Sequence, residues 1–261
     1  MQPFLKDQAN ILRLANALRR TRVPPSENGL FVVFEGIDGA GKTSAASALC
    51  ARLAAGSVDF VVANKLNHSF RDPLLSEAAD YAGRIVLHCS ARSVLPVPRA
   101  VAAADALRFT LLYEGAVRPA LERGQLVLAD AWSYKRILKN AVELSRSVDG
   151  EDYVDWLGTL FGPSVAEDVC LLFDLPVAVA ASRKTGMMTR SELGPGADDS
   201  AEEAGFTTYQ VTLRRQLRQL AEVLNWTEIS ISPDASPDEV AALALDVITA
   251  EARFTSCVRR H

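Results

Sequence analysis

The segment from Gly36 to Thr43 reads GIDGAGKT and matches the spacing G-x-x-x-x-G-K-[ST] at every fixed position. A short apolar run at 30–35 leads into it, and a helix-forming run at 42–55 leads out. Glycines let a loop wrap closely around phosphate oxygens, and the amide groups at the start of a helix attract their negative charge. The sequence therefore predicts a nucleotide phosphate-binding loop between a strand and a helix.

Each position of this loop has a chemical role in that interpretation. Lys42 is expected to reach the β- and γ-phosphates and to act in catalysis, and the Thr43 hydroxyl is expected to ligate Mg²⁺. The predicted ATP-binding residues are Gly36, Ile37, Asp38, Gly39, Ala40, Gly41, Lys42, Thr43 and Ser44.

Short apolar runs alternate along the chain with longer helix-forming segments. The expected strands are 30–35, 58–65, 126–130, 169–174 and 227–232. The expected helices are 42–55, 101–122, 133–160, 203–225 and 237–252. Continuous apolar runs of this length suit strands that are buried on both faces, as in a parallel sheet. The pattern predicts an α/β fold with a doubly wound five-stranded parallel sheet.

The first 29 residues precede this alternation. Residues 4–20 carry apolar side chains at helical spacing, and Pro24 and Pro25 then end the pattern. We expect an N-terminal helical extension over 1–29, either packed on the domain or used as a dimer contact, ahead of a main domain over 30–261 that contains the phosphate-binding loop.

Composition and charge narrow the class of protein. The 261 residues are 49% hydrophobic and 23% charged, which is enough apolar material for the core of one domain. The net charge of −4 lacks the basic excess of nucleic-acid binders. The four cysteines form no Cys-x-x-Cys pair, and no apolar run is long enough to cross a bilayer. We expect a cytoplasmic protein with a small phosphate-bearing ligand, no nucleic-acid partner and no membrane contact.

Asp130 stands at the end of the third expected strand, where ligands bind in open α/β sheets. A carboxylate there can hold Mg²⁺ or accept the proton of an attacking hydroxyl, so Asp130 is a candidate catalytic residue and a candidate metal ligand beside Thr43. The alternative role is a helix N-cap. Glu35 and Asp174 also end expected strands, and we assign them capping or other polar roles.

Four segments resemble the thymidylate kinase family. Phe34–Thr43 matches its narrower loop form E-G-x-D-G-x-G-K-[ST], and Arg118–Gly124 resembles the helix before its third strand. Leu172–Pro176 resembles its L-x-L-x-x-P strand, and Ser232–Val240 resembles its closing segment near the adenine. The resemblance implies the P-loop kinase fold, with 30–261 as a P-loop kinase domain. It also implies ATP as phosphoryl donor, Mg²⁺ as cofactor, a nucleoside monophosphate as small-molecule acceptor, and a homodimer.

The family also uses a flexible lid whose arginines close on the transferring phosphoryl group. Arg183, Lys184 and Arg190 fall in the matching place, so the resemblance implies a lid at about 183–205 and a catalytic role for the two arginines. The alternative for each arginine is a solvated surface cation. Asp38 matches the family carboxylate near the sugar hydroxyl of the acceptor.

The acceptor side departs from the family pattern. Ala131 stands where the family has an arginine that contacts the acceptor phosphate, and an alanine side chain cannot pair with a phosphate. The nearby Lys135 and Arg136 are candidate replacements, although a lysine is not a bidentate clamp.

Further departures affect the rest of the acceptor site. Arg108 is one residue away from the place of a second family arginine, and Asn140 falls near the place of the thymine-reading glutamine. Arg71 begins the remnant of a family R-E-P-G-G-T segment, and Phe70 before it is suited either to stacking on a base or to core packing. The expected acceptor-binding residues are Asp38, Phe70, Arg71, Arg108 and Asn140.

Three hypotheses follow from these residues. The first is an ATP-dependent kinase that phosphorylates a nucleoside monophosphate, with dTMP as the default acceptor. The second keeps the kinase but changes the acceptor to another nucleotide, a nucleoside or a small-metabolite hydroxyl, because the acceptor side is altered. The third is a non-catalytic ATP-binding protein, against which the intact Lys42 and Thr43 argue.

Overall fold

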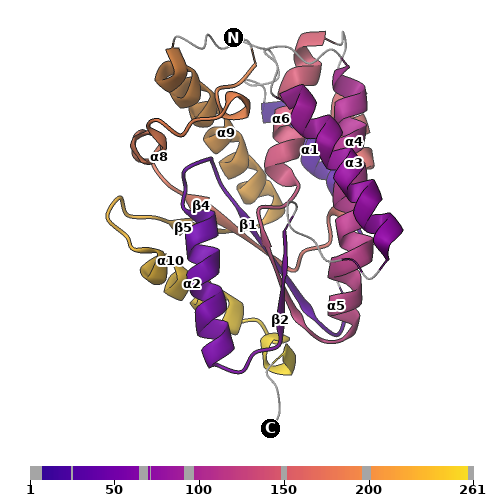
Figure 1. The fold of residues 1–261 in the computed structure, drawn as a ribbon, viewed down its shortest axis with the longest axis vertical. Helices are drawn as coiled ribbons and strands as arrows, with labels where there is room; N and C mark the ends of the chain where they lie inside the picture. Colours follow the sequence, from indigo (N-terminus) through magenta and orange to yellow (C-terminus); the bar gives the residue numbers. More distant parts are fainter. Residues whose placement is uncertain are drawn as a thin grey trace.

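The computed structural model describes residues 8–24, 26–64, 70, 72–90, 97–147, 152–195 and 201–257. Its five strands form a parallel sheet in the order β2-β3-β1-β4-β5 (Figure 1). The strands are β1 Leu30–Glu35, β2 Phe60–Ala63, β3 Leu126–Asp130, β4 Val169–Asp174 and β5 Thr227–Ser230. The five predicted strands are confirmed, and β2 and β5 are shorter than expected.

The position of β1 decides where the phosphate-binding loop lies. Every residue of β1 and β4 is buried, as expected for strands that are covered on both faces. β1 lies between β3 and β4, with Phe34 in register with Asp130 on one side and with Leu171 on the other. In open α/β sheets ligands bind at the carboxyl ends of the strands, where the strand order reverses. The loop after β1 therefore opens at the centre of that edge.

Helices flank this sheet in two groups (Figure 1). α2 packs beside α10, whereas α4, α6, α7 and α9 pack with one another and with α1. The helices are α1 Gln8–Thr21, α2 Lys42–Ala55, α3 Pro73–Ser90, α4 Pro98–Leu112, α5 Arg118–Glu122, α6 Tyr134–Ser147, α7 Asp152–Phe161, α8 Val177–Lys184, α9 Glu202–Leu224 and α10 Pro237–Thr249.

Two helix predictions are wrong in extent. The segment 101–122 is not one α-helix, because a π-helical turn at Tyr113–Val117 separates α4 from α5. The segment 133–160 contains two helices, α6 and α7, and 148–151 lies outside the described residues. The pattern also missed α3 and α8. In α3 the apolar periodicity is blurred, because the large side chains of Leu74 and Leu87 are exposed while small residues face inward.

The N-terminal helix α1 packs on α7 and α9. Leu14 and Leu18 are buried in this contact, and Gly158 of α7 permits a close approach. A Cβ atom added at Gly158 would lie only 2.3 Å from the Cβ of Ala17. The apolar stripe seen in the sequence thus contributes to the core. None of the described helices combines the length and the apolar character needed to cross a bilayer.

Candidate active site

The phosphate-binding loop depends on three glycines with positive φ, namely Gly36, Gly39 and Gly41 at 150°, 83° and 83°. The loop is also pressed against its neighbours. A Cβ atom at Gly36 would lie 2.7 Å from the Phe173 carbonyl oxygen, and one at Gly39 would lie 2.7 Å from the Ala180 carbonyl oxygen. A side chain is therefore excluded at both positions by backbone strain and by contact with β4 or α8.

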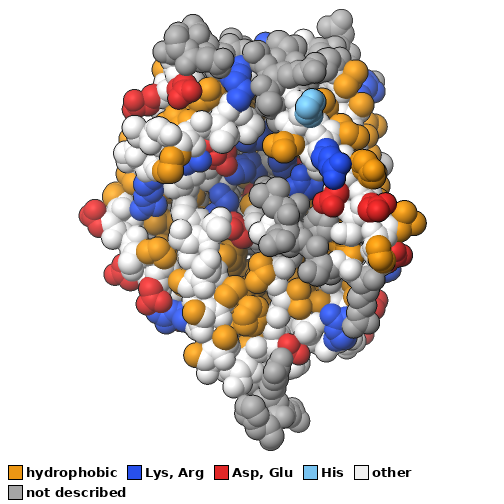
Figure 2. All heavy atoms as spheres, viewed as in Figure 1, with side chains coloured by type: hydrophobic (Ala, Val, Ile, Leu, Met, Phe, Trp, Pro, Cys, Tyr) orange, Lys and Arg blue, Asp and Glu red, His pale blue; other side chains and the backbone are white. Residues whose placement is uncertain are grey.

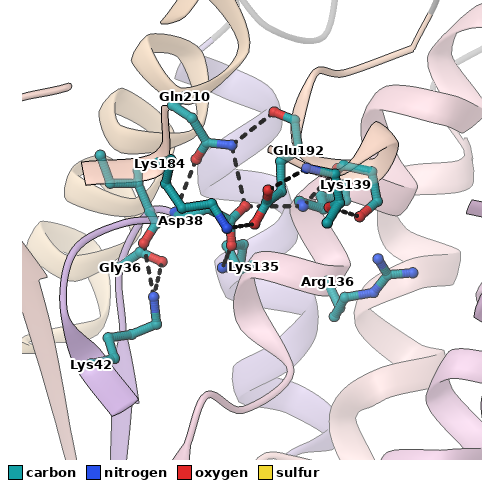
Figure 3. A network of polar contacts seen from close by, with 12 residues as sticks. Gly36, Asp38, Lys42, Lys135, Arg136, Lys139, Lys184, Glu192 and Gln210 are labelled. Carbon is teal, nitrogen blue, oxygen red and sulfur yellow. Dashed lines mark hydrogen bonds and ion pairs between the residues drawn. The ribbon is translucent and has the colours of Figure 1, made fainter. Parts of the chain in front are cut away.

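Lys42 begins α2 and folds back over the loop. Its Nζ donates to the carbonyl oxygens of Gly36 at 3.0 Å and Ile37 at 2.8 Å (Figure 3). Burial and the charge of Lys135 lower the pKa of Lys42, although three nearby carboxylates oppose the shift. A bound phosphate would supply the counter-charge that this buried ammonium needs.

The oxygen donors predicted for Mg²⁺ lie near Lys42. Asp130 ends β3 and is partly exposed, and its charge raises the pKa of Lys42 against the effect of burial. Thr43 follows Lys42 and is exposed. Among the described residues no group of three or more His, Cys, Asp or Glu side chains forms a metal cage. Hard oxygen donors of this number fit Mg²⁺, which protein sites usually hold through one or two carboxylates together with substrate phosphates.

The other two strand-end carboxylates have polar structural partners. Glu35 is fully buried and accepts a hydrogen bond from the backbone amide of Tyr134 at 3.1 Å. Asp174 pairs with Arg214 of α9 through both oxygens, each at 2.6 Å. Both carboxylates have the polar roles expected of them.

Asp38 is the centre of a polar network that joins the loop to α6 and α9 (Figure 3). Its two carboxylate oxygens lie 2.6 Å from Lys135 Nζ and 3.2 Å from Lys139 Nζ. Gln210 of α9 accepts from the Asp38 amide and donates to its carboxylate. Burial alone would raise the pKa of Asp38, yet the lysine charges hold it well below its usual range. Asp38 is therefore ionised and firmly placed.

The segment after α8 contacts the same network. Lys139 Nζ donates to the Ser191 carbonyl at 2.9 Å, and Gln210 Nε2 donates to the Glu192 carbonyl at 3.1 Å. Lys184 also pairs with the Glu192 carboxylate at 2.9 Å. The predicted lid region thus meets the loop through Asp38, while 196–200 lies outside the described residues.

The two predicted lid arginines differ in position. A Cβ atom at Gly41 would lie 3.6 Å from Arg183 Nη1, so Arg183 lies over the loop, and its Nη2 donates to the Pro233 carbonyl at 2.9 Å. Arg190 instead donates to the carbonyl of Gly194 in its own segment at 3.2 Å. The structure brings Arg183 to the phosphate-binding loop, and the catalytic role of both arginines stays a prediction.

The acceptor-side candidates surround a buried carboxylate of α4. Asn140 Nδ2 donates to Asp105 Oδ2 at 3.0 Å, and Arg136 Nε donates to the same oxygen at 2.6 Å. Arg108 is 7% exposed, and its Nε is buried without a hydrogen-bond partner. Burial lowers the pKa of Arg108. Asn140 is thus engaged by Asp105, and Arg108 lies one helical turn from that carboxylate.

Phe70 is the last acceptor-side candidate that the structure describes. Phe70 packs against the core beside Gly115, where an added Cβ atom would lie 2.7 Å from the phenylalanine ring. Its use as a stacking platform stays a prediction. Arg71 lies outside the described residues.

Lys and Arg side chains gather deep in a hollow at the centre of one face (Figure 2). The buried cations around Asp38 include one that sequence reasoning missed, Lys139. Its spacing of four from Lys135 was a usable signal, because such residues share one face of a helix. Gln210 had no signal, since it reaches Asp38 from 172 residues further along the chain.

Comparison with known proteins agrees with this geometry. A thymidylate kinase from Desulfovibrio desulfuricans is 30% identical over 230 residues, which cover 86% of this chain and 97% of that protein. The chain belongs to the thymidylate kinase family. A thymidylate kinase from Rhizorhabdus wittichii is 27% identical over 84% of this chain and 97% of its own length. A probable thymidylate kinase from Thermococcus gammatolerans is 28% identical over 63% and 74%, respectively. No family model matches the chain.

Membership of the thymidylate kinase family confirms the resemblance and the P-loop kinase fold predicted from the sequence. The chain is an ATP-dependent nucleotide phosphotransferase. This identification argues against the hypothesis of a non-catalytic ATP-binding protein.

Proposed function

We propose that this enzyme transfers the γ-phosphoryl group of ATP to a nucleoside monophosphate, with dTMP as the first acceptor to test. One observation carries the proposal. A complete phosphate-binding loop lies beside a cluster of cations. In this cluster Lys135 and Lys139 both donate to the loop carboxylate Asp38, and the charge of Lys135 lowers the pKa of Lys42. Phosphoryl transfer needs mainly positioning and charge neutralisation, and such a cluster supplies both.

Each residue has a defined part in the proposed reaction. The loop amides and Lys42 bind the ATP phosphates, and Asp38 accepts a hydrogen bond from the acceptor's sugar hydroxyl. Mg²⁺, when bound, neutralises charge on the phosphate oxygens, and Thr43 and Asp130 are the residues that would hold it. Arg183 and Arg190, in a lid at about 183–205, close over the transferring group and exclude water.

A specific observation favours a second candidate, a kinase of the same fold with an acceptor other than dTMP. Ala131 stands where the family has an arginine. Asn140 lies near the place of the base-reading glutamine, and its side-chain amide donates a hydrogen bond to Asp105. A site that recognises a different base or group would tolerate both changes.

Formation of ADP from ATP and Mg²⁺ tests the two candidates together. The purified enzyme is assayed with dTMP, with the other nucleoside monophosphates, and with free nucleosides, and the Lys42→Ala variant is the blank. Turnover with dTMP near or above roughly 1 s⁻¹, the usual range for kinases, supports the first candidate. Stimulation by another acceptor alone supports the second. If no monophosphate stimulates ADP formation, the proposal is wrong.

The assembly proposed with this function is a homodimer. Support comes from α3, where Leu74, Tyr81, Ile85 and Leu87 are exposed large apolar side chains. Such surfaces commonly mark protein–protein contacts. Sedimentation velocity over a range of protein concentrations tests the dimer, and a Tyr81→Glu variant that stays dimeric would contradict the use of α3.

We assign 1–29 as an extension of the kinase domain 30–261.

A further inference from the structure

The loss of the family arginine leaves the acceptor phosphate without its expected partner. Ala131 is buried, and the next side chain, Trp132, is directed into the core, where its Nε1 donates to the Ser164 carbonyl at 2.7 Å. Neither residue offers a cation to the active site. If the acceptor is a nucleoside monophosphate, another element must bind its phosphate.

Lys135 and Lys139 are placed for that role on successive turns of α6. Their side chains are only 8% and 11% exposed, and both converge on Asp38 (Figure 3). Taking an ammonium group out of water is costly unless an anion compensates it. Both ammonium groups pair directly with the one carboxylate of Asp38, although the charges of Glu35 and Glu192 also act on Lys135, so direct pairing with Asp38 leaves one positive charge unmatched before any substrate is considered.

The two lysines also lie at the right place relative to the donor. Lys135 pairs with Asp38, and Lys42 donates to the carbonyl oxygen of Ile37, the residue before Asp38. Lys42 is the residue expected to reach the γ-phosphate. Lys139 donates to the Ser191 carbonyl of the lid region. The excess charge is therefore located between the phosphate-binding loop and the lid, where the acceptor phosphate must meet the transferred group.

We propose that Lys135 and Lys139 together bind the phosphate of the acceptor nucleotide in place of the family arginine, and that Asp38 is the counter-ion that holds both ammonium groups in position. This inference rests on the proposed nucleoside monophosphate kinase function. It makes the two lysines specificity-determining residues, because they distinguish a nucleoside monophosphate from the corresponding nucleoside.

The test compares binding of dTMP and thymidine by calorimetry to the full chain and to its Lys135→Met and Lys139→Met variants. Methionine keeps most of the side-chain length and removes the charge. We expect each variant to lose roughly 30-fold or more in dTMP affinity, the usual result of removing one partner of a buried charge pair. Thymidine affinity should change less than about threefold, because the nucleoside has no phosphate for the lysines to bind. If dTMP gives no turnover, the monophosphate that does and its nucleoside are used instead.

Two controls keep the interpretation specific. Lys135→Arg retains the charge and should retain most of the dTMP affinity. Arg52→Met removes an exposed cation of α2 that pairs with Asp238, far from the lysines in sequence, and should change neither affinity. Equal losses for dTMP and thymidine, or no loss for either, would overturn the inference and leave the lysines a structural role. A wild-type enzyme that turns over no monophosphate would instead overturn the proposed function.

Discussion

The phosphate-binding loop and the acceptor side of this enzyme are held in place by different kinds of contact. In the loop, the hydrogen-bond partners of Lys42 are its neighbours in sequence, since it donates to carbonyls five and six residues before it. On the acceptor side the partners come from separate helices, as when Asn140 of α6 meets Asp105 of α4. Lys42 is therefore held by local contacts, whereas the acceptor side, like Asp38 of the loop, depends on helix packing. Loop substitutions should change ATP chemistry with little effect on stability, whereas acceptor-side substitutions should change acceptor binding or stability and leave ATP binding unchanged.

The largest expected effect is on catalysis and comes from Lys42→Ala. Removal of one charged donor to the transferring oxygens should lower the rate of ADP formation by roughly 100- to 1000-fold. The free energy of unfolding should hold or rise, because Lys42 is a buried cation with a lowered pKa. Steady-state kinetics and urea denaturation measure the two quantities. Arg52→Ala on the same helix is the matched control, and a Lys42→Ala rate within tenfold of wild type would exclude the assigned role.

The next effect is on stability and comes from Asp105→Asn on the acceptor side. The Asp105 side chain is 1% exposed and pairs with Arg136, so loss of its charge should lower the free energy of unfolding by about 3 kcal/mol. Asp155→Asn is the control, because Asp155 pairs with Arg13 at a partly exposed site and should cost less than about 1 kcal/mol. ATP affinity should not change in either variant. Equal denaturation midpoints for the two would show that the acceptor side does not depend on this pair.

The sequence predicted the phosphate-binding loop well and the acceptor side poorly. The spacing of the three loop glycines and Lys42 indicates their roles, because all four lie within the nine residues of one loop motif. Asp105 and Gln210 lie on helices whose sequences give no sign of polar function, and only the fold brings them to Arg136 and to Asp38. A single sequence records which residues are neighbours in the chain, but not which helix faces meet.

A smaller effect is expected from Gly39→Ala in the loop. The substitution adds a Cβ atom 2.7 Å from the Ala180 carbonyl oxygen at a residue with φ of 83°. The loop must shift to relieve this contact, so ATP affinity should fall by roughly tenfold, a change typical of local backbone strain. Gly56→Ala at the other end of α2 is the control, because its φ is −81° and its nearest neighbours are 3.6 Å away. Calorimetric titration with ATP compares them, and equal affinities would contradict a strained loop.

The smallest expected change in stability concerns Arg108, and it tests whether the acceptor side is built for binding as well as for packing. Its Nε is buried without a hydrogen-bond partner, so Arg108→Met should alter the free energy of unfolding by less than about 1 kcal/mol or increase it. Arg136→Met is the informative comparison, because it removes the partner of Asp105 and should destabilise the fold.

If Arg108 contacts the acceptor, Arg108→Met should also raise the acceptor KM by roughly tenfold without changing the KM for ATP, as expected for a lost charge-assisted hydrogen bond. Urea denaturation and initial-rate kinetics separate the two effects. A variant that is destabilised as much as Arg136→Met would place Arg108 in the packed framework of the acceptor side. A stable variant with an unchanged acceptor KM would remove Arg108 from the site and leave acceptor recognition to α6 and the loop.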